Sequence, residues 1–166
     1  MGSVNVLFLD YDGVVNTPMW DETGEKCTYN FPQDNKVNNF QCVQWVSEFC
    51  QKYGYSIVVS SSWRNRENYR ECLLNGGLRD GIEILGKTPN LPGTHGSRRG
   101  DEIQMWLDEH PEVDVFIILD DESNVGHLAD HLIKCNTTVG FTLLEFMKAE
   151  ELHWKLDWNN KNEVEQ

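Results

Sequence analysis

The stretch VNVLFLDYDG, residues 4–13, joins a short apolar run to two aspartates. Residues 4–9 carry no charge and are rich in Val, Leu and Phe, which is typical of a strand buried in a parallel sheet. Asp10 and Asp12 follow at once, and both can face one site only if the backbone turns out of the strand between them. Gly13 supplies the conformational freedom for that turn. The stretch therefore predicts a buried strand with two carboxylates at its carboxyl end.

Two further apolar runs lead into polar residues. Residues 56–59 precede three serines, and residues 113–119 precede Asp120 and Asp121. Strands that alternate with helices predict an α/β fold of the doubly wound type, in which helices cover both faces of a parallel sheet. Ligands bind at the carboxyl ends of the strands in such sheets, where these polar residues lie. The pattern predicts helices over 36–53, 65–75, 101–109 and from 142 to about 154, and shorter strands over 82–85 and 132–139.

The length of 166 residues favours one domain, which we place at residues 1–158. Residues 17–31 are polar and rich in turn formers, and we expect a flap or small hairpin there. Residues 159–166 are predicted to form a disordered tail.

Charge and cysteine content restrict the partners and the compartment. The net charge of −13 argues against gripping long nucleic acid through phosphate contacts alone, but it is compatible with a short end held locally. The five cysteines are odd in number and form no CxxC pair, which predicts reduced thiols and a cytoplasmic protein. No apolar run approaches the ~18 residues needed to cross a bilayer, so no membrane association is expected. The oligomeric state is left open.

The aspartates at two strand ends predict a metal site. Asp10, Asp12, Asp120 and Asp121 would meet in a small space, where like charges strongly disfavour one another. A hard cation resolves this repulsion, and Mg²⁺ prefers carboxylates, water and phosphate oxygens. The cluster therefore predicts Mg²⁺ as cofactor.

The same residues suit the hydrolysis of a phosphate ester. One carboxylate would attack phosphorus to give an acyl phosphate, and the second would protonate the leaving oxygen and later deprotonate water. Ser60 or Ser61 can supply a hydroxyl for the other phosphoryl oxygens, and Arg98 or Arg99 can supply a cation.

Four motifs resemble those of the haloacid dehalogenase (HAD) superfamily, in the same order. LDYDGVV resembles the first motif, VVSSSWR the second, RRGDEIQMWL the basic third and IILDDES the fourth, and together they span residues 4–124. The combination of SSSWR, RGDEI and ILDD looks especially like bacterial and phage members, including domains associated with RNA repair. The resemblance implies a Rossmann-like HAD core with a minimal cap or none, because the segments between motifs are largely needed for core elements.

The resemblance also assigns roles by position. Asp10 resembles the nucleophile and a magnesium ligand, and Asp12 resembles the general acid–base whose backbone carbonyl binds the metal. Asp120 resembles the metal-ligating acid, and Asp121 resembles either a residue that contacts the metal's ligands or an alternative ligand. The third motif usually carries a lysine; here two arginines replace it, and Arg99 is favoured over Arg98.

The sequence alone leaves the roles of several residues and the choice between several functions open. Trp63, Arg64 and His95 are candidate substrate contacts, although a tryptophan is more often part of a core and a lone loop histidine is usually just exposed. We expect a phosphorylated substrate, with a nucleotide or a nucleic-acid 3′ or 5′ end as the first choice. The alternatives are a small-metabolite phosphatase, a catalytically silent module that binds phosphate or a protein, and a regulatory module acting through its acidic C-terminal helix.

Overall fold

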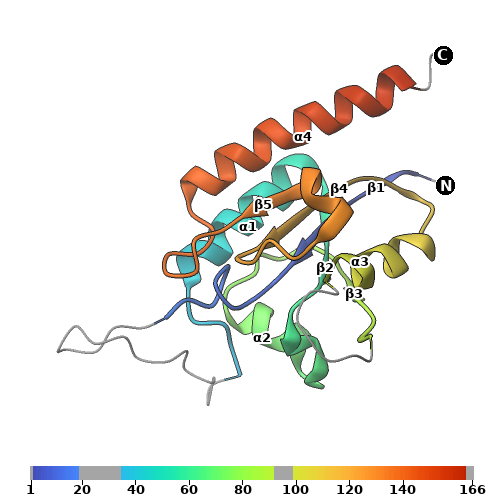
Figure 1. Cartoon of the computed structure of the whole chain (residues 1–166). Coiled ribbons are helices and arrows are strands. Elements are labelled where there is room, and N and C mark those ends of the chain that lie inside the picture. The colour runs from blue at the N-terminus through green and yellow to red at the C-terminus, as the bar shows by residue number, and fades with distance from the viewer. Residues whose placement is uncertain (1, 19–34, 92–98, 164–166) are drawn as a thin grey trace.

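The computed structural model describes residues 2–18, 35–91 and 99–163, and a five-stranded parallel sheet lies at its centre (Figure 1). The strands follow the order β3-β2-β1-β4-β5. Leu9 of the central strand pairs with Val59 on one side and Leu119 on the other, so the three strands end within one residue of the same level. The strands are β1 (Val4–Leu9), β2 (Tyr55–Val59), β3 (Ile84–Lys87), β4 (Val113–Asp120) and β5 (Leu132–Lys134).

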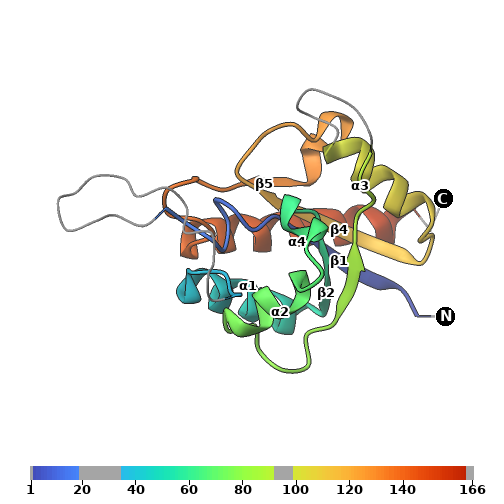
Figure 2. The same ribbon diagram turned by 90° about the horizontal axis from the view of Figure 1, so that it is seen from below.

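Helices cover both faces of this sheet, which confirms the predicted doubly wound α/β class. α1 (Phe40–Tyr53), α2 (Tyr69–Asn75) and α4 (Leu143–Glu163) pack on one face. α3 (Arg99–Asp108) and the 3₁₀ helix η2 (Gly126–His131) pack on the other. Figure 2 shows α1 and α2 on one side of the strands and α3 on the opposite side. Between β2 and α3, the described segments supply a second 3₁₀ helix η1 (Ser62–Asn65), α2 and β3.

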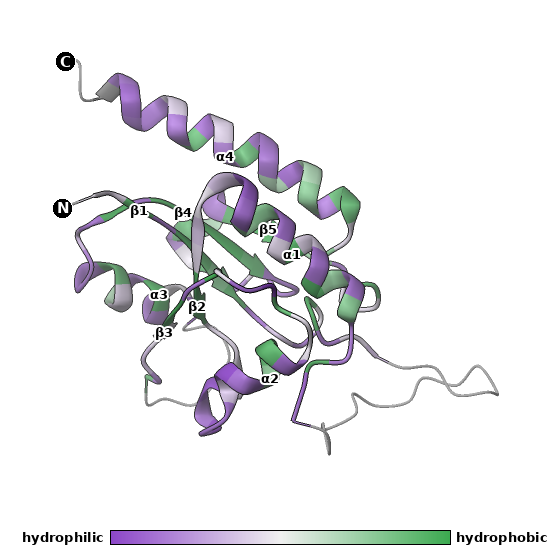
Figure 3. Cartoon of the chain, turned by 180° about the vertical axis from the view of Figure 1, so that it is seen from behind, coloured by the Kyte–Doolittle hydropathy of each residue, from purple (hydrophilic) through white to green (hydrophobic). Residues whose placement is uncertain are grey.

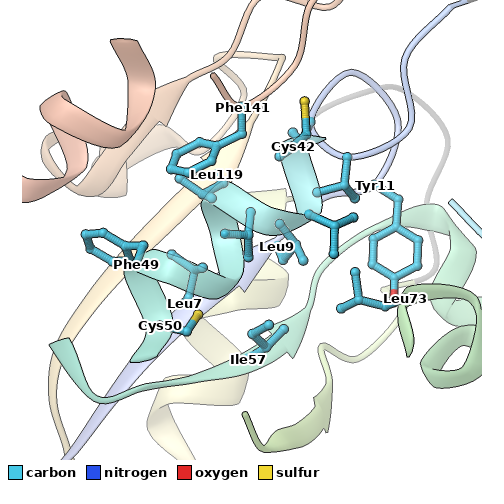
Figure 4. Close-up of a cluster of buried hydrophobic side chains, with 14 of the residues drawn as sticks. Leu7, Leu9, Tyr11, Cys42, Phe49, Cys50, Ile57, Leu73, Leu119 and Phe141 are labelled. Atoms are coloured by element: carbon cyan, nitrogen blue, oxygen red, sulfur yellow. The ribbon is translucent and has the colours of Figure 1, made fainter. Parts of the chain in front are cut away.

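The alternation of side chains along β1 divides the core in two. Leu7 and Leu9 join the larger cluster beneath α1 and α4, whereas Val6 and Phe8 join the cluster beneath α3. Successive strand residues point to opposite faces, so a continuous apolar run is what a strand covered on both faces requires. Figure 4 shows the larger cluster, in which Phe49 of α1 lies near Leu7. In Figure 3 the strands are predominantly apolar, while α4 mixes polar and apolar residues along its length.

The boundaries differ from the sequence-based expectation where local hydrogen bonds end an element. α1 begins at Phe40 instead of residue 36, because the side chain of Asn39 caps it by accepting from the Cys42 N–H. It ends at residue 53 as predicted, where Gly54 follows as a left-handed cap with φ 69°. The helix expected over 65–75 is split into η1 and α2, and the strand expected over 132–139 spans only three residues.

The last helix begins as expected but runs further. A capping box opens it near residue 142: Glu145 Oε2 accepts from the Thr142 N–H at 3.0 Å, and the Leu144 N–H donates to the Thr142 hydroxyl. α4 continues to Glu163, so residues 159–163 of the expected tail are helical. Asn160 Nδ2 donates to the Asp114 carbonyl at 2.6 Å, which ties the distal turns to the start of β4.

Several expectations concern parts of the chain outside the described residues, including most of the flap placed at 17–31 and the last three residues. The described cysteines, 42, 50, 72 and 135, are buried free thiols. Within residues 2–18, 35–91 and 99–163, the helices lack the combination of length and hydropathy that crossing a bilayer requires.

Candidate active site

The hydrogen-bond ladder of the sheet continues one residue past each strand, which brings polar residues side by side. The Asp10 N–H donates to the Leu119 carbonyl and the Ser60 N–H donates to the Leu9 carbonyl, both at 3.0 Å. Asp10 and Ser60 therefore leave adjacent strands at the same edge, next to Asp120 at the end of β4. Parallel strands place their carboxyl ends together, and this edge is where such sheets bind ligands.

A tight turn after β1 separates the two aspartates. Tyr11 is fully buried between them and its hydroxyl donates to the Tyr69 carbonyl at 2.7 Å. Its own carbonyl accepts from the N–H groups of residues 14, 15 and 16, at 3.2, 2.9 and 2.8 Å. Gly13 adopts φ +74°, a region that L side chains rarely occupy. The buried Tyr11 side chain and the left-handed conformation of Gly13 together bring Asp10 and Asp12 out of the strand.

Three carboxylates converge where β1 and β4 end. Asp10, Asp120 and Asp121 each place an oxygen so that these atoms all lie within 4.8 Å of one another. Burial and, next, the charge of Asp120 raise the pKa of Asp10 to about 8, although Arg99 and a hydrogen bond with Ser61 oppose the shift. Burial also raises the pKa of Asp120. The cluster is therefore under electrostatic strain that positive charge would relieve.

Arg99, the first residue of α3, supplies part of that charge. Its Nε lies 3.3 Å from Asp120 Oδ2 and its Nη2 lies 4.0 Å from Asp10 Oδ1. Its Nη1 is buried and has no hydrogen-bond partner among the described residues. Arg99 thus contacts Asp10 and Asp120 and keeps one buried donor without a partner among the described residues.

The neighbours of Asp120 and Asp121 orient them but leave acceptor capacity. Asp120 Oδ1 accepts from the Glu122 N–H at 3.0 Å, and Asp121 Oδ2 accepts from the Thr137 hydroxyl at 2.9 Å. Asp120 Oδ2 is buried and accepts no well-formed hydrogen bond from the residues that the structure describes. Buried polar atoms are normally satisfied, so an oxygen of this kind is suited to a cation.

The donor set therefore fits a hard divalent cation. Asp10, Asp120 and Asp121 could hold it through carboxylate oxygens, the ligand type that Mg²⁺ prefers. The carboxylate of Asp12 lies outside this group, so Asp12 is available for a different task.

The carboxylate of Asp12 accepts one hydrogen bond on each oxygen. Trp63 Nε1 donates to Oδ2 at 3.1 Å, and Asn16 Nδ2 donates to Oδ1 at 2.7 Å. Trp63 comes from η1, which begins at Ser62, the third of the serines that follow β2. Asn16 was not singled out from sequence, although it lies only four residues after Asp12.

The serines that sequence could not separate have different surroundings. Ser61 interacts with Asp10, and its hydroxyl accepts from the Trp63 N–H at 3.3 Å. The Ser60 hydroxyl is buried and has no hydrogen-bond partner within the described part of the chain. Of the two, Ser61 is the one brought to the carboxylates.

Arg64 is buried and contacts the backbone of the serines. Its guanidinium is buried, forms an ion pair with Glu102 at 2.7 Å and donates to the carbonyls of Ser60 and Ser61 at 3.0 Å. These contacts fix the backbone that carries the serines. Glu102 and Thr137 are two more residues that sequence reasoning missed, because no local pattern links them to partners far away in the chain. Arg98 and His95 lie outside the described residues.

Asp10 and Asp12 follow the central strand β1, and Asp120 and Asp121 lie at the end of the neighbouring strand β4. This arrangement is that of a domain of the HAD superfamily. The chain belongs to the family described as the HAD domain in Swiss Army Knife RNA repair proteins, whose model matches residues 6–146. Domains of this superfamily are generally hydrolases of the phosphatase type. No curated protein matches the chain significantly.

Proposed function

We propose that this chain is a Mg²⁺-dependent phosphomonoester hydrolase that acts through an aspartyl phosphate on Asp10. The observation that carries the proposal is the convergence of Asp10, Asp120 and Asp121 within 4.8 Å at the carboxyl edge of the sheet, beside Arg99. A buried carboxylate cluster of this kind suits a dianionic phosphate bound through a cation. When bound, Mg²⁺ would neutralise the cluster and offset charge on the phosphoryl oxygens.

In the first step, a carboxylate oxygen of Asp10 forms a bond to phosphorus while the ester P–O bond breaks. Protonated Asp12 gives its proton to the leaving oxygen, which departs as an alcohol. Ser61, which interacts with Asp10, and the buried unpartnered Nη1 of Arg99 would hydrogen-bond the equatorial oxygens.

In the second step, Asp12, now a carboxylate, takes a proton from water as the water oxygen attacks phosphorus. The bond between Asp10 and phosphorus breaks, and inorganic phosphate leaves. The net reaction consumes one water and converts a phosphomonoester into an alcohol and phosphate, with both aspartates restored.

We propose a nucleic-acid end as the substrate class. The family description, which names RNA repair proteins, supports this choice. Two basic side chains next to residues around the site support it as well: Arg66 lies over the Trp63 ring at 4.5 Å, and Lys87 Nζ, at the end of β3, donates to the Arg64 carbonyl at 2.8 Å. A few local cations suit the phosphates next to a strand end even in a chain of net charge −13.

The mechanism is tested by phosphate release with and without Mg²⁺ from an aryl phosphate, mononucleotides and oligonucleotides phosphorylated at either end. Asp10→Asn and Asp12→Asn should both lose Mg²⁺-dependent turnover. Asp80→Asn is a matched control, because Asp80 is exposed near the start of β2, at the end of the strands opposite to the site. Acid-quenched wild-type enzyme should carry one phosphoryl group by intact mass, and Asp10→Asn should carry none. Turnover that survives in Asp10→Asn would exclude the proposed nucleophile.

The substrate class is tested separately. Lys87→Ala should raise KM for an end-phosphorylated oligonucleotide but not for the aryl phosphate. The slope of the logarithm of the binding constant against the logarithm of the salt concentration should become shallower by about 0.7 for each phosphate contact that is lost. Lys155→Ala, a change on exposed α4, is the control. Equal efficiency on small metabolites and oligonucleotides would favour the small-metabolite alternative.

A further inference from the structure

We propose that Trp63 and Asn16 are positioning residues that hold the carboxyl group of Asp12 in a single orientation for proton transfer. The inference rests on the proposed function, since it assigns these side chains to the acid–base step of that reaction. It differs from reading Trp63 as a surface for substrate, because it gives the indole a partner inside the protein.

The surroundings of Trp63 leave little of its ring for a ligand. The side chain is only 6 % exposed. Tyr11 packs edge-on against it with ring centroids 5.5 Å apart, and the Arg66 guanidinium lies over it at 4.5 Å. The polar end of the indole points to Asp12 Oδ2, 3.1 Å away. Buried tryptophans normally place Nε1–H on a partner, and here that partner is the proposed acid–base.

The orientation of the Asn16 amide is decided by its other contact. The Asn38 backbone N–H, which can only donate, lies 3.2 Å from Asn16 Oδ1. The amide nitrogen must therefore face Asp12, where it donates to Oδ1 at 2.7 Å. Asn38 is held in turn by two hydrogen bonds with the backbone of Thr17, at 2.8 and 2.7 Å. Asn16 is fully buried, so this network is rigidly packed.

The hydrogen bonds from Trp63 and Asn16 restrict which positions on the Asp12 carboxyl group can carry the acidic proton. Indole N–H and amide NH₂ groups only donate, so neither can take the proton from Asp12. Each carboxylate oxygen offers two acceptor positions, and one on each is already used. The acidic proton is confined to the remaining positions, and rotation of the carboxyl group would break both hydrogen bonds. Trp63 and Asn16 would thus contribute the fixed geometry that general acid catalysis requires.

This role predicts a defect that depends on the leaving group. An aryl phosphate with an acidic phenol can expel its leaving oxygen without a proton, whereas an alkyl or ribose oxygen needs the proton of Asp12. Loss of the Trp63 donor should therefore lower kcat/KM by about tenfold or more for alkyl phosphates, a part of the ~10²–10⁴-fold that a general acid supplies. Activated aryl phosphates should change little.

The experiment measures kcat/KM for phosphate esters of graded leaving-group pKa in wild type, Trp63→Phe and Asn16→Ala, each with saturating Mg²⁺. The cleanest variant replaces Trp63 site-specifically by benzothienylalanine, in which sulfur replaces the indole N–H while the ring size is kept. Trp106→Phe is the matched control, because Trp106 is also 6 % exposed but belongs to α3 and packs in the other core cluster.

A steeper dependence on leaving-group pKa in the Trp63 variants, with the control parallel to wild type, is the expected result. A uniform loss across all esters in the benzothienylalanine protein, or no loss, would overturn the positioning role while leaving the phosphatase intact. An inactive wild type would instead count against the proposed function itself. These two failures are therefore distinguishable.

Discussion

Gly13 lies against the Asp121 side chain so closely that a β-carbon built on the glycine would come 2.3 Å from Asp121 Oδ2. The turn that releases Asp10 and Asp12 from β1 is thereby packed against a residue of the second acidic pair. A glycine is needed for two reasons, since φ is +74° and no space is available for a side chain.

Gly13→Ala should therefore weaken both stability and metal binding. The backbone conformation alone costs about 1 kcal/mol in a non-glycine residue, and displacement of Asp121 adds to it. Urea unfolding and a Mg²⁺ titration followed by thermal shift measure the two effects. Gly54→Ala is the matched control: its φ is +69° but nothing lies within 4 Å of the added carbon, so it should lose stability without losing Mg²⁺ affinity. Similar Mg²⁺ affinities in the two variants would contradict the steric argument.

Asp120→Asn should stabilise the metal-free protein and abolish its stabilisation by Mg²⁺. Burial makes the charged form of Asp120 unfavourable and its charge disfavours ionised Asp10, so a neutral isostere relieves both effects, by about 1 kcal/mol. The measurement is the free energy of unfolding at neutral pH with EDTA and with excess Mg²⁺. Asp130→Asn, an exposed site, controls for net charge. A metal-free protein destabilised by Asp120→Asn would show that the contact with Arg99 outweighs the repulsion.

Removing the charge of one partner of the buried Arg64–Glu102 ion pair should strongly destabilise the protein. Glu102→Gln is expected to lower the free energy of unfolding by about 3 kcal/mol, because it leaves the buried Arg64 guanidinium without its counter-charge. The Arg79–Glu48 pair has a similar separation, 2.6 Å, but its side chains are 37 % and 47 % exposed, so Glu48→Gln should cost less than about 1 kcal/mol. Chemical denaturation compares the two variants directly. Equal costs would mean that burial does not govern the strength of these pairs.

His153 should make α4 sensitive to mild acid. Burial lowers the pKa of His153 below its usual 6.5, and its Nδ1 lies 3.0 Å from the Tyr55 hydroxyl. Because the folded protein favours the neutral ring, this contribution to stability is present above the unfolded pKa and is lost as pH falls below about 6.5. His153→Gln should therefore differ from wild type more at neutral pH than in mild acid.

Melting temperatures of wild type and His153→Gln across this range provide the test. Ala149→Gly, a buried and non-titrating change in the same helix, should shift the melting temperature by a similar amount at each pH. A pH-independent difference for His153→Gln would remove the histidine as the cause.

Sequence reasoning was most successful where local chemistry decides structure. The apolar run of β1 and the end of α1 at Tyr53 lie where expected, because a strand covered on both faces must be apolar throughout and the left-handed cap after α1 is a glycine. It was less successful at the start of α1 and in the distal part of α4. There Asn39 and Asn160 make hydrogen bonds that helical periodicity does not reveal.

The sequence by itself determined the class of the fold and the edge of the sheet at which the aspartates gather. These follow from the order of strands and helices and from the residues directly after each strand. Only the tertiary structure decided the partners of each polar side chain: Ser61 with Asp10, Arg99 with Asp120, and Trp63 with Asp12 across 51 positions of the chain. The physical reason is that hydrophobic patterning is a local property of the sequence, whereas a hydrogen bond depends on where packing places two distant side chains.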